Sequence, residues 1–305
     1  MSHDSLSSSS TSLLYLPPKH DFNMRIQSSV AFGLWAGAAT AAQSSCGTSS
    51  SSHALRAVTE KLKGDLEIRG GRKHVTINTY VHVIGASDKE EDGYITDETV
   101  KGQIDLLNKS YKSWDFSFKL IETTRSINES WADNPGGSPV EDPTEPDFRA
   151  ALRKGSYKDL NLFYIKDMVP GGKCELPIPN PTSQDIVNDG CLMRSENPGQ
   201  LPPTYGFVTV HEVGHWLGLE HTFENGCEEP GDGVDDTPAE AYPVADGDCP
   251  EPGRDTCPDQ PGLDPVDNFM TYISPDCGPQ RFTPGQAKRM HSLWKKLRAN
   301  CKPKA

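Results

Sequence analysis

The feature of this sequence that most constrains its fold is the segment HEVGHWLGLEH at residues 211–221. On a helix, with about 100° per residue, His211 and His215 lie about 40° apart and about 6 Å apart along the axis. Both imidazoles therefore face one ion from one side. On a continued helix, His221 would lie about 240° round from His215. It joins the other two only if the chain leaves the helix, and Gly218 permits this because glycine enters the left-handed conformation without steric cost.

This pattern predicts a metal centre. Three neutral imidazoles that leave a fourth position for water are the ligand set of a catalytic zinc site, since a structural zinc site is closed by four protein ligands. We therefore expect one zinc ion per chain. Glu212 adjoins the first ligand, and its carboxylate reaches a metal-bound water rather than the metal. It is predicted to accept a proton from that water and to pass it to a leaving amine.

The start of the chain has the character of a targeting segment. Residues 24–42, MRIQSSVAFGLWAGAATAA, combine a positive charge, an uncharged apolar run and an A-x-A pattern, the three parts of a secretory signal peptide. Because such a signal works best at the amino terminus, translation is predicted to start at Met24, and residues 1–23 are interpreted as an extension of the gene model. The alternative is a tail helix that packs on the body. The predicted location is secreted and extracellular.

Composition excludes several classes of protein. A net charge of −13, from 43 carboxylates against 30 Lys and Arg, disfavours a nucleic-acid partner. No apolar stretch approaches the ~20 residues needed to span a bilayer, which excludes an integral membrane protein. The 27 glycines and 25 prolines indicate a loop-rich body rather than a helix bundle.

The cysteines and sequons agree with export. None of the eight cysteines is spaced as C-x-x-C, so a zinc knuckle is not indicated. Four lie between residues 227 and 277, in a stretch too poor in apolar residues to fold by burial alone, where disulfides are the natural remedy. Sequons at Asn108 and Asn128 fit a glycoprotein, although such matches also arise by chance.

Hydrophobic periodicity predicts the organisation of the chain. Residues 43–73 are Ser-rich and then charged, as in a linker or short pro-segment, and a single domain is expected over 74–301. Strands are predicted from 75 to 83, 116 to 121 and 160 to 169, with helices opening at Thr96 and spanning 148–154; residues 190–195 form a candidate edge strand. A helix over 207–218, a long irregular stretch and a closing helix over 283–298 follow.

This order predicts an α/β (α+β) fold. A mixed, mostly parallel twisted sheet with helices forms an upper subdomain, helix 207–218 is central, and a coil-rich, disulfide-linked lower subdomain follows.

The motifs resemble a known family. The spacing H-E-x-x-H-x-x-G-x-x-H is the metzincin signature, and NFMTY at 268–272 is a candidate Met-turn. Together with the spacing of residues 277–290, Cys-x4-Phe-Thr-x-Gly-Gln-x-x-Arg-Met, they resemble the pappalysin (cytophagalysin) family in its secreted fungal-type form, over about residues 75–295. The residue after the third histidine is Thr222, where other metzincin groups have Glu, Asp or Ser.

The resemblance implies a metzincin-like fold and a secreted zinc endopeptidase that acts on polypeptide substrates. The sequence leaves the oligomeric state open, with a monomer favoured. Met270 would give the imidazoles a polarisable apolar floor, and Tyr272 would stabilise the oxyanion. The family pattern pairs Cys249 with Cys277 and Cys227 with Cys257, with Cys174 and Cys191 closing a third loop; sequence alone permits three pairings of four cysteines.

Three further sites are implied, each with an alternative. Asp276 occupies the floor of the pocket for the residue after the scissile bond, which would favour Arg or Lys there, or it is a solvated loop residue. A calcium site or an acidic turn accounts for Asp232, Asp235 and Asp236. Cys46 resembles a pro-segment thiolate that caps the zinc until activation. The family's preceding Arg is replaced by Ser45, and a disulfide between Cys46 and Cys301 is the alternative.

Two other functions use the same residues. One is a zinc hydrolase that acts on a non-peptide amide, and the other is a secreted, disulfide-stapled binding protein with structural zinc. Glu212 separates the catalytic from the structural hypothesis, because a structural site needs no carboxylate beside its first ligand.

Overall fold

The computed structural model describes residues 46–49, 51–65, 73–133, 145–168, 171–195, 204–243, 249–273 and 277–301. The chain divides into two compact units, Met1–Thr40 and Ala41–Ala305, and every described residue belongs to the second. The predicted signal peptide, the residues before it and Asp276 lie outside the described residues.

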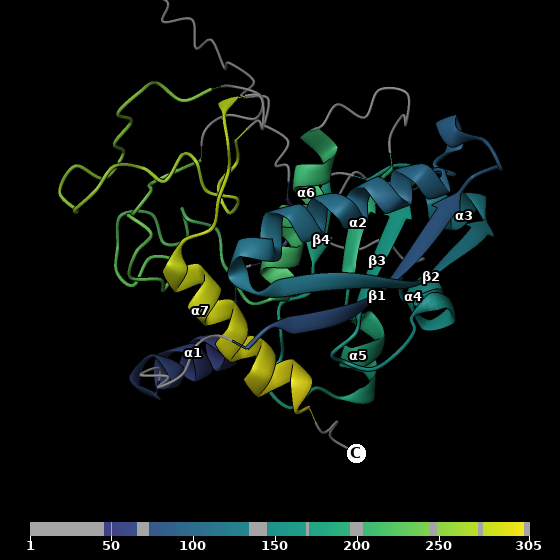
Figure 1. Cartoon of the computed structure of the whole chain (residues 1–305), viewed down its shortest axis with the longest axis horizontal. Helices are drawn as coiled ribbons and strands as arrows, with labels where there is room; N and C mark the ends of the chain where they lie inside the picture. Colours follow the sequence, from purple (N-terminus) through teal and green to yellow (C-terminus); the bar gives the residue numbers. More distant parts are fainter. Residues whose placement is uncertain are drawn as a thin grey trace, which may run out of the picture. The chain divides into compact units, whose positions relative to one another are not determined.

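A five-stranded sheet is the central element of the described unit (Figure 1). Its strands are β1 (Val75–Gly85), β2 (Phe116–Ile127), β3 (Leu160–Ile165), β4 (Gly172–Cys174) and β5 (Cys191–Arg194). Their order across the sheet is β2-β1-β3-β5-β4; all neighbours are parallel except β4 and β5. The predicted mixed, mostly parallel sheet is confirmed.

Two predictions for the strands are wrong. Residues 190–195 are not an edge strand, because β5 lies between β3 and β4. The edge strand on this side of the sheet is β4, whose three residues are too few to show an alternating pattern in the sequence. The strand predicted over 160–169 ends at Ile165, where pairing with β1 and β5 stops.

Helices pack on both faces of the sheet. Alternate residues of β3 divide between two cores: Leu162 and Tyr164 pack on the side of α2 and α6, whereas Phe163 and Ile165 pack on the side of α3 and α4. The helices are α1 (His53–Asp65), α2 (Asp97–Tyr111), α3 (Glu129–Ala132), α4 (Glu145–Leu152), α5 (Ser183–Asn188), α6 (Thr204–Trp216) and α7 (Pro284–Leu293), with 3-10 turns Glu90–Asp92 and Lys112–Trp114 and a π-helical turn Trp294–Ala299.

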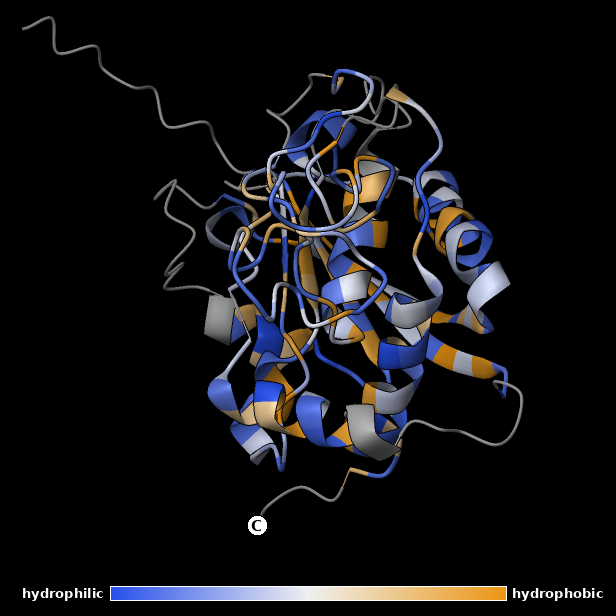
Figure 2. Cartoon of the chain, turned by 90° about the vertical axis from the view of Figure 1, so that its left-hand side faces the viewer, coloured by the Kyte–Doolittle hydropathy of each residue, from blue (hydrophilic) through white to orange (hydrophobic). Residues whose placement is uncertain are grey.

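The burial pattern of helix α2 confirms the apolar stripe that the sequence predicts for it. The Thr96 hydroxyl accepts a hydrogen bond from Thr99 N and caps the helix, and the stripe expected from the sequence is buried, comprising Val100, Ile104, Leu107 and Tyr111. Figure 2 shows the resulting alternation of hydrophobic and hydrophilic residues along the helices.

The segment predicted as a linker or short pro-segment, 43–73, contains helix α1. Its Leu55 is buried against Leu293 and Leu297 at the end of the chain, with Val58 and Leu62 packed beside it. These apolar residues recur at i, i+3 and i+7, the spacing of a helix face. Helix α1 therefore packs on the domain that follows it.

The described residues between 217 and 283 form the coil-rich part, which two of the disulfides cross-link. The structure contains the bonds Cys227–Cys257 and Cys249–Cys277 there, and Cys174–Cys191 between β4 and β5. These are the pairs that the resemblance implies. None of the described helices is both long and apolar enough to cross a membrane.

Candidate metal centre

Helix α6 carries His211 and His215 and ends one residue after the second. Gly218 then adopts a φ of +99°, in the left-handed region that favours glycine. A Cβ at this position would also collide with the Leu293 side chain. The chain turns at Gly218 and brings His221 back beside the two helical histidines.

The three imidazoles converge through their Nε2 atoms. His215 Nε2 lies 3.0 Å from His211 Nε2 and 3.2 Å from His221 Nε2. A tetrahedral zinc ion with Zn–N distances of about 2.0 Å places its nitrogen ligands about 3.3 Å apart. The arrangement of the three nitrogens thus fits one ion.

The outer nitrogens fix the tautomers of two of these histidines. His211 Nδ1 lies 2.6 Å from Phe269 O, and His215 Nδ1 lies 2.8 Å from Leu219 O. A carbonyl only accepts hydrogen bonds, so both Nδ1 atoms carry the proton and both Nε2 atoms keep a lone pair for the metal.

Burial keeps these rings neutral. It lowers the pKa of His211 to about 4 and holds the pKa values of His215 and His221 well below their usual range. Neutral imidazole is the form that binds metal ions.

Glu212 is fully buried beside the first ligand. Its Oε2 accepts a hydrogen bond of 2.9 Å from the Thr48 hydroxyl, whereas Oε1 is buried and has no hydrogen-bond partner among the described residues. Such an oxygen is costly unless a water or an ion completes it. Burial raises the pKa of Glu212 to about 8, and a divalent cation at the three histidines would lower it and keep the carboxylate ionised.

The segment Asn268–Tyr272 lies beneath the histidines. Met270 is fully buried, and a Cβ on Gly214 of α6 would lie 2.5 Å from its sulfur, so the thioether packs directly under the helix. The Tyr272 ring lies 5.2 Å from the ring of His221, and its hydroxyl donates a hydrogen bond of 3.3 Å to Cys46 O. This segment occupies the place expected of a Met-turn.

Cys46 is the fourth potential ligand. Its Sγ lies 3.5 Å from His215 Nε2, and its ligand atom and those of the three histidines all lie within 4.8 Å of one another. A tetrahedral zinc ion with Zn–S of about 2.3 Å places sulfur and nitrogen about 3.5 Å apart. The structure does not contain the alternative disulfide between Cys46 and Cys301.

Two contacts of the preceding segment were not anticipated from the sequence. Thr48 bridges the edge strand and Glu212, because its hydroxyl also accepts a hydrogen bond of 2.8 Å from Cys174 N. Arg56 of α1 contacts the carboxylates of Glu220 at 3.6 Å and Glu224 at 3.1 Å, on either side of His221. These contacts join residues far apart in the sequence, so no local spacing pattern predicts them. The apolar stripe of α1 was the sequence feature that could have indicated that this segment packs on the domain.

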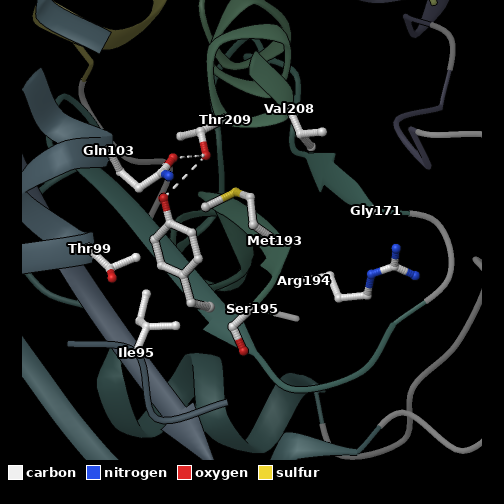
Figure 3. A pocket seen from close by; sticks show the side chains of 10 residues that line it. Ile95, Thr99, Gln103, Gly171, Met193, Arg194, Ser195, Val208 and Thr209 are labelled. Carbon is white, nitrogen blue, oxygen red and sulfur yellow. Dashed lines mark hydrogen bonds between the residues drawn. The ribbon is translucent and has the colours of Figure 1, made fainter. Parts of the chain in front are cut away.

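The other side of α6 is anchored to the upper subdomain. The Thr209 hydroxyl donates to Gln103 Oε1 at 3.0 Å and lies 3.2 Å from the Tyr164 hydroxyl (Figure 3). The cavity at this point, about 10 Å³, is too small for a substrate side chain. These contacts hold the helix in place.

Comparison with known proteins places this geometry in a family. Residues 182–295 match the family model described as pregnancy-associated plasma protein-A, peptidase M43. An extracellular metalloprotease of Pyricularia oryzae is 43% identical over 231 residues, 74% of this chain and 77% of that protein. One of Colletotrichum graminicola is 40% identical over 74% of this chain and 78% of that protein.

This chain belongs to the pappalysin family of metalloproteases. Mature mirolysin of Tannerella forsythia, solved with a cleaved peptide, has the same fold: the TM-score is 0.60 at 21% identity, over 75% of this chain and 97% of that chain. The family confirms the predicted metalloendopeptidase function and the metzincin-like fold, and it disfavours the two alternatives.

Proposed function

We propose that this protease hydrolyses peptide bonds at one zinc ion held by His211, His215 and His221. The observation that carries the proposal is the approach of three Nε2 atoms to 3.0–3.2 Å, with two of the opposite nitrogens donating to carbonyls. Bound there, zinc supplies a Lewis acid that lowers the pKa of water and polarises the scissile carbonyl.

Glu212 is the general base of the proposed mechanism. It takes a proton from the attacking water and delivers it to the leaving amine. Its buried, unpartnered Oε1 supports this role. The Tyr272 hydroxyl donates a hydrogen bond to the substrate oxygen as negative charge develops there, and Met270 supports the rings from below.

Glu212→Gln tests this assignment, because the amide keeps the shape of the side chain and cannot accept the proton. We expect one zinc per chain and a loss of casein cleavage of about 10²–10⁴-fold. A variant that keeps full activity would overturn the general-base role. Loss of the wild-type activity on chelation of zinc, and its return on adding zinc, tests the metal.

The segment around Cys46 supports a latent, zymogen-like form. Cys46 forms an isolated parallel bridge with Gly172 of the edge strand β4, and Gly47 N donates to Gly172 O at 2.7 Å. The Cys46 thiolate would fill the fourth position of the zinc site, while the Thr48 hydroxyl donates its hydrogen bond to the Glu212 carboxylate. Substrate reaches the site only after this segment leaves. Cleavage within the basic run at residues 69–73, most of which lies outside the described residues, would release it.

Secretion remains a proposal that the relatives' description as extracellular supports. Amino-terminal sequencing of the secreted protein tests both the signal peptide at 24–42 and the suggested start at Met24. Retention of residues 2–23 would contradict the second. Monomeric state is tested by light scattering.

Calcium binding at Asp232, Asp235 and Asp236 also stays a prediction. The Asp232 carboxylate accepts hydrogen bonds from Thr237 Oγ1 and Val234 N, and Asp236 accepts from Thr283 Oγ1 and Gly285 N. These partners favour the acidic-turn alternative. Melting curves with calcium and with a calcium chelator distinguish the two.

Two further predictions concern substrate specificity and glycosylation. Asp276 is proposed to select Arg or Lys after the scissile bond; a peptide library cut only before apolar residues would exclude this.

Of the two sequons, Asn128 is the better acceptor for a glycan. The side-chain amide of Asn108 donates to Ile104 O and Phe118 O, which a glycan on that nitrogen would disturb. Peptide mapping tests both.

A further inference from the structure

Glu240 lies in the coil-rich segment between the third histidine and the Met-turn, yet its side chain is fully buried. Its Oε2 accepts a hydrogen bond of 2.7 Å from the Thr222 hydroxyl. Its Oε1 accepts one of 3.2 Å from the Thr271 hydroxyl and one of 2.7 Å from Arg254. One carboxylate thus receives three donors from three separate segments.

The two hydroxyls belong to residues that adjoin the metal centre. Thr222 follows the ligand His221, and Thr271 follows Met270. The same two segments are joined by their backbones, since Thr222 N donates to Met270 O at 3.2 Å. Glu240 therefore fastens the chain of the third ligand to the Met-turn.

His221 needs such a constraint more than the other two ligands. His211 and His215 each have an Nδ1 bound to a backbone carbonyl, whereas His221 Nδ1 has no hydrogen-bond partner in the described part of the chain. The contacts of its ring with the described residues include other rings, stacked on Phe223 at 4.6 Å and edge-on to Tyr272 at 5.2 Å. The position of its backbone then decides where its Nε2 lies.

An ionised carboxylate is suited to this place. Both oxygens face donors, and glutamine in the same position would turn an NH₂ group toward one of them. Arg254 supplies the positive charge that a buried carboxylate requires, and it also contacts the buried Asp264 at 2.6 Å. Asp264 differs from Glu240 in that its Oδ1 binds the backbone and hydroxyl of Thr256, away from the ligands.

We propose that Glu240 is a positioning residue of the metal centre, which holds His221 against the Met-turn through Thr222 and Thr271. This inference rests on the proposed function, in which the three histidines bind zinc. Outer partners of metal ligands typically contribute 10–100-fold to metal affinity. A loss of that size is expected when the link is broken.

The test compares Glu240→Gln, Thr222→Val and Asp264→Asn in the full chain. Asp264→Asn is the matched control, because it removes a buried carboxylate from the same arginine without touching Thr222 or Thr271. The readout is the rate at which zinc passes to a chelating dye, together with urea unfolding of each metal-free protein.

We expect zinc release to be 10–100-fold faster for Glu240→Gln and Thr222→Val, and unchanged for Asp264→Asn, with similar unfolding curves for the metal-free forms. Equal acceleration in all three variants, or wild-type release from Glu240→Gln, would overturn the positioning role. The wild type is measured first: if it binds no zinc, the proposed function fails, a result separate from any difference between variants.

Discussion

At the scale of single residues, the site depends on positions that only glycine can occupy. Gly218 is required by its φ of +99° and by the Leu293 side chain that fills the space of a Cβ. Gly214 is required because Met270 lies against the helix at that point. These glycines allow helix α6 to end and to approach the Met-turn.

Gly218→Ala is expected to destabilise the fold by about 1–3 kcal/mol, since alanine is strained at positive φ, and to weaken zinc binding by displacing His221. Gly102→Ala is the control, because Gly102 lies in α2 with open space around a Cβ. Alanine there should stabilise by about 0.5–1 kcal/mol. Urea unfolding measures both changes; equal effects would contradict this explanation.

His82 provides a pH dependence outside the metal centre. It is buried between Thr124 and Asn161, and burial lowers its pKa from 6.5 to about 4. Lys154 and Arg153 add to this lowering and Glu122 opposes it. The folded state thus binds the proton more weakly than the unfolded state does.

The contribution of His82 to stability is therefore complete above about pH 6.5 and is lost as the pH falls toward about 4, by up to about 3 kcal/mol. The free energy of unfolding, measured between pH 7 and pH 4.5 for the wild type and for His82→Gln, should fall less steeply in the variant. Parallel curves would show that His82 does not titrate in this way.

At the scale of elements, helix α1 would hold the segment of Cys46 and Thr48 in place in the proposed latent form. Leu55 is its apolar anchor, and Arg56 pairs with two glutamates that flank the third histidine. Only seven residues lie between Thr48 and Arg56 in the sequence. Loss of an anchor should therefore free Cys46 from the metal.

Arg56→Ala is expected to raise the basal activity of the unprocessed chain a few-fold, as expected for the loss of about 1 kcal/mol of charged hydrogen bonding. Leu55→Ala should raise it further because a buried leucine contributes about 2–5 kcal/mol. Lys61→Ala changes an exposed residue of the same helix and serves as the control. Casein cleavage before and after processing gives the ratio; unchanged latency in both anchor variants would contradict the role of α1.

The elements also show what the sequence could and could not reveal. Periodic burial predicted α2, the parallel strands and the central helix, because each follows from side chains that share one face. β4 has only three residues, and its place depends on pairing with β5 and with Cys46. The Glu240 network was invisible for a similar reason, since it joins residues 222, 240, 254 and 271 across coil with no repeating spacing.

At the scale of the whole domain, the metal centre lies where the sheet-containing part and the coil-rich part meet. α6 comes from the first, and His221, Met270 and Tyr272 come from the second. The ion is thus expected to join the two parts as well as to serve catalysis.

Removal of zinc should lower the melting temperature, since a ligand present at a thousand times its Kd stabilises the folded state by about 4 kcal/mol. Hydrogen exchange should increase around residues 217–243 and 265–273, and much less in β1 and β3. Uniform exchange throughout the domain, or no change, would contradict this division.

The central claim is that three imidazoles hold one zinc ion and that Cys46 fills the fourth position until the segment leaves. X-ray absorption at the zinc edge measures this directly. For the full chain we predict three nitrogens at about 2.0 Å and one sulfur at about 2.3 Å; after removal of residues before 74, oxygen should replace the sulfur. Absence of zinc, or fewer than three nitrogen ligands, would contradict the account.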